Sequence, residues 1–508
     1  MLRRYKRKKN GQPVLYEEKP ELDGLALTVE NINNQIGDSS DIMIRQLLVN
    51  GKKELPVTAI FVDGLVDSKS VDDDILKPLL QESILSQPGK EQDIIEKIIS
   101  GALYHKAAVV RNKIDECIED ILDGSVALVF NSEQKAVTFD IKGFEKRPIT
   151  EPTGENIIKG AKDAFVEVLR VNTSLIRRKI RTQNLRIKET KVGVQTLTGI
   201  AVVYIEGLTN PKLIDEVMKR IDSIHIDGAI ISGYVEEYIV DDKWSVFPQV
   251  MYTERSDKLC RHVLEGRVGL FIDGMPIAYI IPAVFYMFLR APEDEANNYF
   301  AASVIRLIRY GSYLASLVIP AFYIAITTFH QEMIPTKLAL SIIKSKEGVP
   351  FPTFAEIIFM LIAFELLIEA GLRLPKTIGQ SVSIVGAVVV GQAAVAAKFL
   401  SPAVIVVIAL TGICGFTMPN QDFSNAIRLW RLLLVLFSAI AGLFGLTFGM
   451  LLMCYKLAGM ESFGVPYLSP YVGGDGKELF NNTFIRLPHF LEKKRPMDSR
   501  TINKKRQR

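Results

Sequence analysis

The sequence has little of what catalytic and metal-binding proteins usually carry. Its four cysteines lie far apart and never show the C-x-x-C spacing of a zinc site or a redox motif: Cys117, Cys260, Cys414 and Cys454. Its five histidines are scattered, and no H-E-x-x-H, G-x-x-x-x-G-K-[ST] or G-x-S-x-G pattern occurs. We therefore expect reduced thiols, no catalytic residues, no metal site and no cofactor, and we do not expect an enzyme.

The sequence also lacks a signal peptide and a strong net charge. Charges and Pro20 interrupt the apolar stretch that would have to follow the basic start, so we expect the first half to stay in the cytoplasm. The net charge is only +4 over 508 residues, and much of the basic excess lies in residues 3–9 and 493–508. Such runs are usually solvated tails; the alternative is contact with anionic lipid headgroups or nucleic acid, of which the lipid of the cytoplasmic leaflet is favoured.

The first half of the sequence contains a duplication. Three segments match three later ones in the same order: Asp41–Arg45 with Asn184–Lys188, Ile60–Leu65 with Val203–Leu208, and Ile121–Val126 with Val263–Val268. Each copy has the pattern of a helix, an alternating strand, a continuous apolar strand closed by an acid-Gly pair, a helix and a last apolar strand. We therefore expect two duplicated mixed α/β subdomains, 39–145 and 146–275, after a basic segment and first helix at 1–38.

The acid-Gly pairs, such as Asp63-Gly64, have two interpretations. They could belong to phosphate-binding loops or supply catalytic carboxylates. Because they occupy matching strand ends in both copies, a turn that needs the positive φ of glycine is the favoured interpretation. A long basic helix is expected over Glu155–Arg181, where its charged face is either solvated or docked on lipid headgroups or an acidic partner.

The second half concentrates the apolar residues. A helix needs about 20 apolar residues to cross a bilayer. This length criterion predicts an all-α polytopic membrane domain at 276–460, followed by a basic cytoplasmic tail at 461–508. Spans are expected near 311–329, 381–397, 402–417 and 431–455, with 300–310 as an interfacial helix and 277–289 as the connector from the second subdomain. Because both ends are expected in the cytoplasm, the number of crossings is even; four is preferred and six is the alternative.

A fifth apolar stretch, 353–372, carries three glutamates and is interpreted as a re-entrant, interfacial or spanning helix. Glu365, Glu369 and Arg373 recur every four residues, so they form one charged stripe in which the last two can neutralise each other. Ionisable groups at membrane depth cost several kcal/mol, so this helix must face protein, water or the interface.

The glycine-rich stretch around 381–397 has two interpretations as well. Its small residues would let membrane helices pack closely. Alternatively, four residues on one narrow helical arc would line a pore with a hydrophobic constriction in a symmetric oligomer: Ser381, Val385, Val388 and Gln392.

Six motifs follow one another along residues 40–470: Arg147–Pro152, Phe247–Arg255, Leu264–Val268, Ala325–Pro335, Gly379–Val395 and Phe463–Pro470. Together they resemble the A subunit of GerA-type spore germinant receptors. One departure is Lys159–Phe165, where the family more often has an Arg-Gly-Pro-Arg-type sequence, and it puts in question only a shared contact at that loop.

The resemblance implies a subunit of a nutrient sensor in the spore inner membrane. Its implied partners are a transporter-like B subunit, a lipoprotein C subunit, other copies of the A subunit and membrane lipids, with no nucleic acid. The implied activity is a ligand-gated ion channel that releases cations to start germination. Two other classes stay open at this point. A secondary transporter would need inverted repeats in the membrane half, and a membrane-tethered enzyme would use acid-Gly turns such as Asp63-Gly64.

Overall fold

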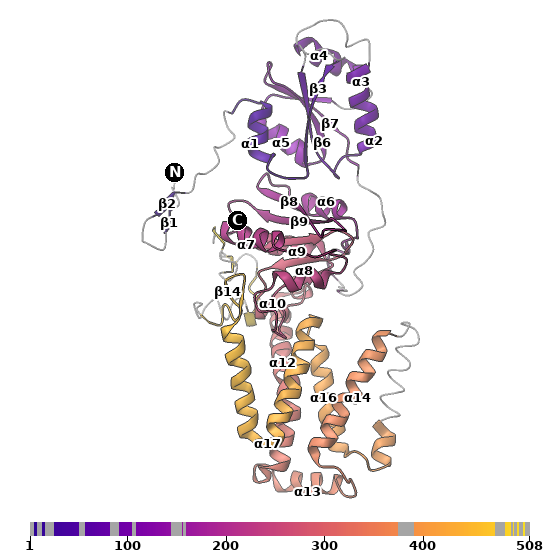
Figure 1. The fold of residues 1–508 in the computed structure, drawn as a ribbon, viewed down its shortest axis with the longest axis vertical. Coiled ribbons are helices and arrows are strands. Elements are labelled where there is room, and N and C mark those ends of the chain that lie inside the picture. Colours follow the sequence, from indigo (N-terminus) through magenta and orange to yellow (C-terminus); the bar gives the residue numbers. More distant parts are fainter. Residues whose placement is uncertain are drawn as a thin grey trace.

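The computed structural model describes residues 5–7, 13–15, 25–49, 56–81, 91–103, 108–143, 155, 159–373, 391–472, 483–488, 491, 495–496 and 501–502. Along the long axis of the molecule, a first α/β unit is followed by a second α/β unit and then by a group of long helices (Figure 1). Two short strands, β1 (Tyr5–Arg7) and β2 (Pro13–Leu15), pair with each other near the N-terminus. The first half is therefore mixed α/β and the second half is helical.

The first α/β unit is a five-stranded antiparallel sheet. Its strands lie in the order β3-β4-β6-β7-β5. Their bounds are Ile42–Leu48 for β3, Pro56–Val62 for β4, Ala108–Arg111 for β5, Ser125–Phe130 for β6 and Lys135–Asp140 for β7. Helices α1 (Val29–Ile36) and α5 (Ile114–Leu122) cover one face. The other face is covered by α2 (Ser68–Ser70), a π-helix (Val71–Leu76), α3 (Lys77–Gln81), α4 (Glu91–Lys97) and a second π-helix (Ile98–Ala102).

The second α/β unit repeats this topology. Its strands lie in the order β8-β9-β11-β12-β10, which is the order of the first sheet, element for element. The strands are Leu185–Val192 (β8), Thr198–Ile205 (β9), Met251–Thr253 (β10), Val268–Ile272 (β11) and Ala278–Ile281 (β12). Helices α6 (Leu169–Lys179) and α9 (Ser256–Leu264) cover one face, and α7 (Pro211–Asp222) and α8 (Ser232–Ile239) cover the other. The duplication expected from the sequence is therefore confirmed.

The acid-Gly pairs are turns, as the favoured interpretation of the sequence holds. Gly64 and Gly207 have φ of 84° and 75° at the ends of β4 and β9, and Gly124 and Gly266 have φ of 98° and 89° before β6 and β11. A side chain with a Cβ atom rarely adopts these values, so glycine is needed at each of the four positions.

Three expectations for the second unit need correction. The helix expected over Glu155–Arg181 covers only Leu169–Lys179, because Ala164 instead forms a β-bridge with Arg255 and Phe165 donates its backbone N–H to Glu254. The segment expected to connect the subdomain to the membrane forms β12 and then α10 (Phe285–Phe288). The sheet therefore extends beyond the boundary expected at residue 275, because β12 pairs with both β10 and β11.

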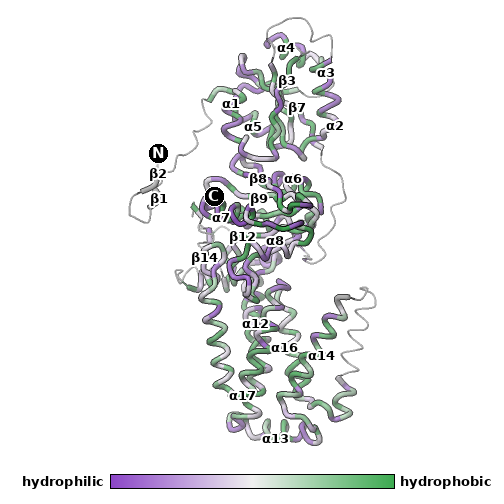
Figure 2. The backbone as a smooth tube through the Cα atoms, in the orientation of Figure 1, coloured by the Kyte–Doolittle hydropathy of each residue, from purple (hydrophilic) through white to green (hydrophobic). Residues whose placement is uncertain are grey.

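The helical region consists of a few long elements. They are α11 (Glu293–Ala296), α12 (Tyr299–Thr328), a 3₁₀ turn (Gln331–Met333), α13 (Thr336–Ser345), α14 (Thr353–Arg373), α16 (Pro402–Phe416) and α17 (Gln421–Gly459). The long helices of this region are largely apolar (Figure 2). Among the described residues, α12 and α17 are long and apolar enough to cross a membrane. The expected interfacial helix at 300–310 is not a separate element, because it is the first part of α12.

The stretch 431–455 is not one continuous helix, because α17 is a hairpin of two antiparallel arms. Its backbone leaves the helical conformation at Ala441 and Gly442, where Gly442 has φ 60° and ψ −134°. Phe437 and Phe448 meet edge to face across the two arms with ring centroids 5.7 Å apart. A Cβ atom on Gly449 would lie 2.5 Å from Leu434, so glycine allows this close approach. Each arm is about 25–30 Å long at 1.5 Å per residue, close to the thickness of a hydrocarbon core.

Helices α14 and α16 run parallel to each other. The backbone N–H of Ser401 donates to Glu356 near the start of both helices at 2.7 Å. Further along, Phe364 of α14 packs on Phe416 of α16 with centroids 5.9 Å apart. Both helices therefore point the same way along the long axis of the helical region.

The chain after α17 packs against the second unit, so the described residues of the expected C-terminal tail are not simply solvated. Strands β13 (Glu461–Ser462) and β14 (Val465–Pro466) form a small hairpin, and Tyr467 is fully buried. Near the other end of this segment, the backbone N–H of Ile502 donates to the carbonyl of Leu208 at 3.0 Å.

Candidate functional site at the junction of the second sheet and the helices

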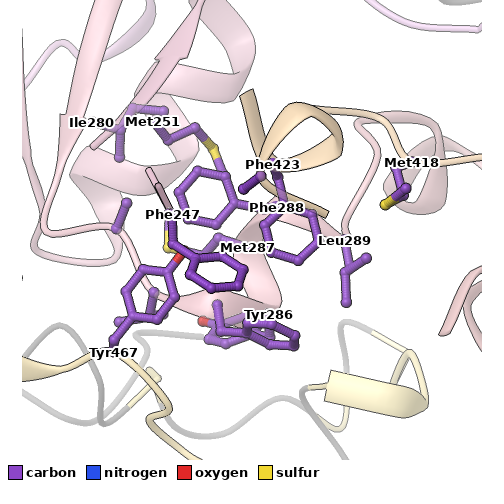
Figure 3. Packing of buried hydrophobic residues seen from close by; sticks show 14 of the residues in the cluster. Phe247, Met251, Ile280, Tyr286, Met287, Phe288, Leu289, Met418, Phe423 and Tyr467 are labelled. Carbon is purple, nitrogen blue, oxygen red and sulfur yellow. The ribbon is translucent and has the colours of Figure 1, made fainter. Parts of the chain in front are cut away.

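An aromatic cluster joins the second sheet to the helical region (Figure 3). Phe247, just before β10, packs on Trp430 of α17 and on Tyr467, with ring centroids 6.1 and 6.4 Å away. Phe285 and Phe288 of α10 pack on Phe423 at the start of α17, at 5.3 and 5.8 Å. One continuous hydrophobic core therefore runs from β8, β9, β11 and β12 into α12, α16 and α17.

A buried carboxylate lies beside this cluster. Asp294 of α11 is only 2% exposed, and its carboxylate accepts hydrogen bonds from Arg306 at 3.1 Å and from Arg309 at 2.9 Å, both on α12. Arg309 also donates to the carbonyl of Leu289 at 2.8 Å. Burying charges is tolerable only when they are paired and hydrogen-bonded, and here two guanidinium groups share one carboxylate. The start of α12 is thus fixed to the segment that follows α10.

A second charged group links α9 to the same place. Arg261 of α9 lies 2.7 Å from Glu295 of α11 and 3.5 Å from Glu265. Burial alone would raise the pKa of the Glu265 carboxyl, but the charge of Arg261 and the contact with His262 hold this pKa well below its usual range. Burial lowers the pKa of His262 to about 4, so the imidazole is neutral near pH 7. The carboxylate is therefore held by arginine and not by a charged histidine.

Several of the sequence motifs meet at this junction. Phe247 and Tyr467 belong to two motifs more than 200 residues apart, and Glu265 and Arg267 belong to a third. The motif Ala325–Pro335 lies at the opposite end of α12, where Phe329 and His330 lie against Gly442 in the α17 turn. The sequence identified these segments, but it gave no sign of Asp294, the shared acceptor for Arg306 and Arg309.

Glu365, the first residue of the predicted charged stripe, has partners that the sequence did not indicate. Glu365 of α14 lies 3.1 Å from Arg431 and 3.3 Å from Arg428, both on the first arm of α17. The side chain of Arg373 lies outside the described residues, so its expected pairing with Glu369 stays a prediction. Nearer the start of α14, the buried Glu356 lies 3.3 Å from Lys346. Through Glu356 and Glu365 this helix faces protein, which is one of the three surroundings expected for its ionisable side chains.

The proposed pore residues are mostly not described. Ser381, Val385 and Val388 lie outside the described residues, and Gln392 is exposed on a short helical segment before α16. No group of three or more histidine, cysteine, aspartate or glutamate side chains that could hold a metal ion occurs among the described residues. All four cysteines are free thiols, and burial raises the pKa of Cys117 and Cys260 to about 12, so these two are inert.

The fold is a duplicated α/β head whose second copy shares its core with a group of long apolar helices, and two of these helices are long and apolar enough to cross a membrane. Residues 30–498 match the family described as Bacillus/Clostridium GerA spore germination protein. The chain therefore belongs to the GerA family of A subunits of spore germinant receptors.

Similarity extends over nearly the whole chain in individual relatives. Spore germination protein KA of Bacillus subtilis (strain 168) is 36% identical over 94% of this chain and 88% of its own length. The uncharacterized membrane protein YfkQ of the same organism is 36% identical over 94% of this chain and 92% of its own length. The crystal structure of the N-terminal domain of the A subunit of the Bacillus megaterium spore germinant receptor GerK3 is 27% identical, covers 51% of this chain and 94% of that domain, and has a TM-score of 0.40.

Proposed function

We propose that this protein is the A subunit of a nutrient germinant receptor in the spore inner membrane, and that several copies form a ligand-gated ion channel that releases cations to start germination. Its partners in this proposal are a transporter-like B subunit and a lipoprotein C subunit. Membership of the family supports the receptor role. The ion-channel activity is the finer part of the proposal. It rests on the glycine-rich stretch around 381–397 and on the junction of the second sheet and the helices.

The observation that carries this proposal is the shared core of the second sheet and the helices. Phe247 contacts Trp430 of α17, and Asp294 is bonded to Arg306 and Arg309 of α12. Packed cores are bistable rather than continuously deformable, so a displacement of the head has to move these helices as well. A signal from a partner that binds the head can reach the membrane by this route.

We propose six crossings, with both ends of the chain in the cytoplasm. The crossings are α12, α14, a return segment containing the apolar residues 381–397, α16 and the two arms of α17. The parallel course of α14 and α16 supports the return segment, and the turn at Gly442 supports two crossings in α17 where the sequence predicted one. Cysteine-accessibility labelling in sealed membranes tests this topology, because residues before Thr353 and residues after Arg373 should then be reached from opposite sides.

The pore is proposed to be lined by Ser381, Val385, Val388 and Gln392 of neighbouring copies. The valines would form a constriction that excludes water when closed. We expect Val388→Ala to widen this constriction, so that spores lose cations and germinate without nutrient. Val406→Ala on α16, where the wild-type side chain is 67% exposed, is the matched control and should leave ion retention unchanged. Normal dormancy in the Val388→Ala spores, with normal amounts of the subunit, would contradict the assignment of the pore.

A further inference from the structure

The loop between α8 and β10 presents a tryptophan to the outside. Trp244 is 94% exposed, whereas the other tryptophan of the chain, Trp430, is 8% exposed in the junction. Tyr234 and Tyr238 of α8 are also exposed, at 47% and 39%. These three aromatic residues, which we name the aromatic patch, lie on the second subdomain. Exposed apolar patches of this kind mark interaction surfaces.

The loop that carries Trp244 is held in place by many bonds. The buried side-chain oxygen of Gln249 accepts hydrogen bonds from the backbone N–H groups of Asp241 and Asp242, both at 3.0 Å. Asp241 also pairs with Arg220 at 2.6 Å. The backbone N–H of Trp244 donates to the Asp242 carboxylate at 3.0 Å. The indole is therefore presented by a fixed loop, and its exposure is built into the fold.

The same loop is bonded to the end of the second arm of α17. Asp242 pairs with Lys456 at 2.5 Å, and Ser245 donates to the sulfur of Met460 at 3.4 Å. On the other side of the loop, Asp241 accepts the backbone N–H of Phe463 at 2.6 Å. These contacts place Trp244 at the level where the arm ends, and not further up the head.

The exposed surface of this arm is apolar up to that level. Phe444, Leu451 and Tyr455 are 75%, 69% and 81% exposed, and Tyr455 directly precedes Lys456. Trp and Tyr side chains collect at the boundary between hydrocarbon and water because their rings are apolar at one end and polar at the other. A tyrosine and a tryptophan at the end of an apolar arm match this distribution.

Charge in the loop fits an anionic surface. The carboxylates of Asp241 and Asp242 each lie against a cation, Arg220 and Lys456, and Arg220 also pairs with Glu216 at 2.8 Å. Lys243 lies over the ring of Tyr238, 5.2 Å from its centroid, and adds a positive charge within the aromatic patch. A lysine near the membrane surface is attracted to anionic lipid headgroups.

We propose that the aromatic patch is a lipid-docking surface: Trp244 inserts between the headgroups of the leaflet that faces the second subdomain, with Tyr234, Tyr238 and Lys243 beside it. This inference rests on the proposed crossing of the membrane by the second arm of α17. It goes beyond that topology because it assigns a soluble loop of the head to the bilayer. The head is then oriented by lipid contact in addition to its junction with the helices.

Intrinsic fluorescence tests the proposal in the full-length protein, because the chain has two tryptophans. Trp430→Phe leaves Trp244 as the only emitter. The variant is placed in vesicles that contain phosphatidylcholine and an anionic phospholipid, with a nitroxide on the headgroup or bromine on the acyl chains. We expect a blue-shifted emission, strong quenching by the headgroup nitroxide and weak quenching by acrylamide in the buffer. If Trp430→Phe does not fold, the difference in emission between the wild type and Trp244→Phe gives the same readout.

A second fluorescent reporter tests the membrane crossing of the second arm of α17 separately from lipid docking by Trp244. Leu451→Trp, combined with Trp244→Phe and Trp430→Phe, places one indole on the exposed face of the arm and should be quenched by acyl-chain bromine. Loss of that quenching contradicts the crossing itself. Quenching at Leu451→Trp, together with free access of acrylamide to Trp244, leaves the crossing intact and overturns lipid docking. A third outcome would also overturn lipid docking. In this outcome neither acrylamide nor the headgroup nitroxide quenches Trp244, and the protection is lost when the protein is diluted to single copies. A second copy, and not lipid, would then cover the aromatic patch.

Discussion

The two α/β units have the same strand order but different surroundings. In the first unit, α1 and α5 cover one face of the sheet, and the hydrophobic cluster there ends with them. In the second unit, the equivalent face is covered by α6 and α9, and its cluster continues through α10 into α12, α16 and α17. The opposite faces are closed by helices in both units. The fold was thus duplicated, and only one copy became part of the helical core.

The two copies are joined to their neighbours by different chemistry. Between the copies, Arg177 of α6 forms two hydrogen bonds of 2.8 and 2.9 Å to Asp41, and both side chains are almost fully buried. Arg170 also pairs with Asp63 at 3.0 Å, and the backbone N–H of Ser40 donates to the carbonyl of Ile187 at 2.8 Å. Between the second copy and the helices, buried charges and a large aromatic core act together. We infer that polar contacts hold the two copies together, whereas the second copy is held to the helices by a shared apolar core as well.

The largest expected effect comes from Asp294→Asn. This change leaves the buried guanidinium groups of Arg306 and Arg309 without their carboxylate, and breaking a buried pair costs about 3–5 kcal/mol. We expect a large loss of thermal stability of the detergent-solubilised protein, with the helices affected first. Asp73→Asn is the control, since its pair with Lys77 is exposed on the first copy. Equal melting of the two variants would show that the junction does not depend on this carboxylate.

A comparable effect is expected at the contact between the copies. Arg177→Met removes one partner of a buried pair and should cost about 3–5 kcal/mol, because Asp41 keeps an uncompensated charge. The double variant Arg177→Met with Asp41→Leu removes both charges and should recover much of this loss. Limited proteolysis between the copies, followed over temperature, measures the effect. If the double variant is as labile as the single one, packing rather than charge holds the copies together.

The sequence predicted those features of the two copies that depend on residues close together in the chain. The apolar strands β4 and β9 and their glycine turns are local patterns, so both copies could be recognised. Strand β12 was missed because its four residues and the nearby Pro282 resemble a linker when its partners β10 and β11 are unknown. The turn at Gly442 was missed because the residues around it are apolar on both sides, so the run resembles a single span. The partners of Glu365 lie more than 60 residues away, and no local pattern contains them.

Gly64 and Gly207, which occupy equivalent turns in the two copies, allow a test with a smaller expected effect. An alanine at Gly207 meets only open space, so its cost is the backbone strain of a positive φ, about 1 kcal/mol. An alanine at Gly64 would also place its Cβ atom 2.2 Å from the hydroxyl oxygen of Ser174 on α6. Crowding of this kind costs about 1–3 kcal/mol more. Thermal unfolding of both variants should therefore show the larger loss at Gly64, because this turn lies against the other copy, and equal losses would mean that Ser174 moves aside.

A pH-dependent effect is expected at the outer helix of the second copy, α8. Burial, followed by the negative charge of Asp422 on α17, raises the pKa of Glu236 from 4.5 to about 7, while Tyr279 donates a hydrogen bond to this carboxyl at 3.3 Å. The folded protein therefore holds this proton more tightly than the unfolded chain. Its contribution to stability is complete below pH 4.5 and is lost as the pH rises through about 7.

Glu236→Gln removes this titration. The change should be close to neutral at low pH and stabilising by about 2 kcal/mol at pH 8, after allowance for partial exposure of the carboxyl. Unfolding curves of the wild type and the variant measured from pH 5 to 8 should separate as the pH rises. Glu237→Gln on the exposed side of α8 is the control, and it should stay close to the wild type because the charge of Glu237 is the smallest of the causes that raise the pKa of Glu236. Parallel curves for Glu236→Gln and the wild type would mean that neither burial nor the charge of Asp422 holds the proton on Glu236.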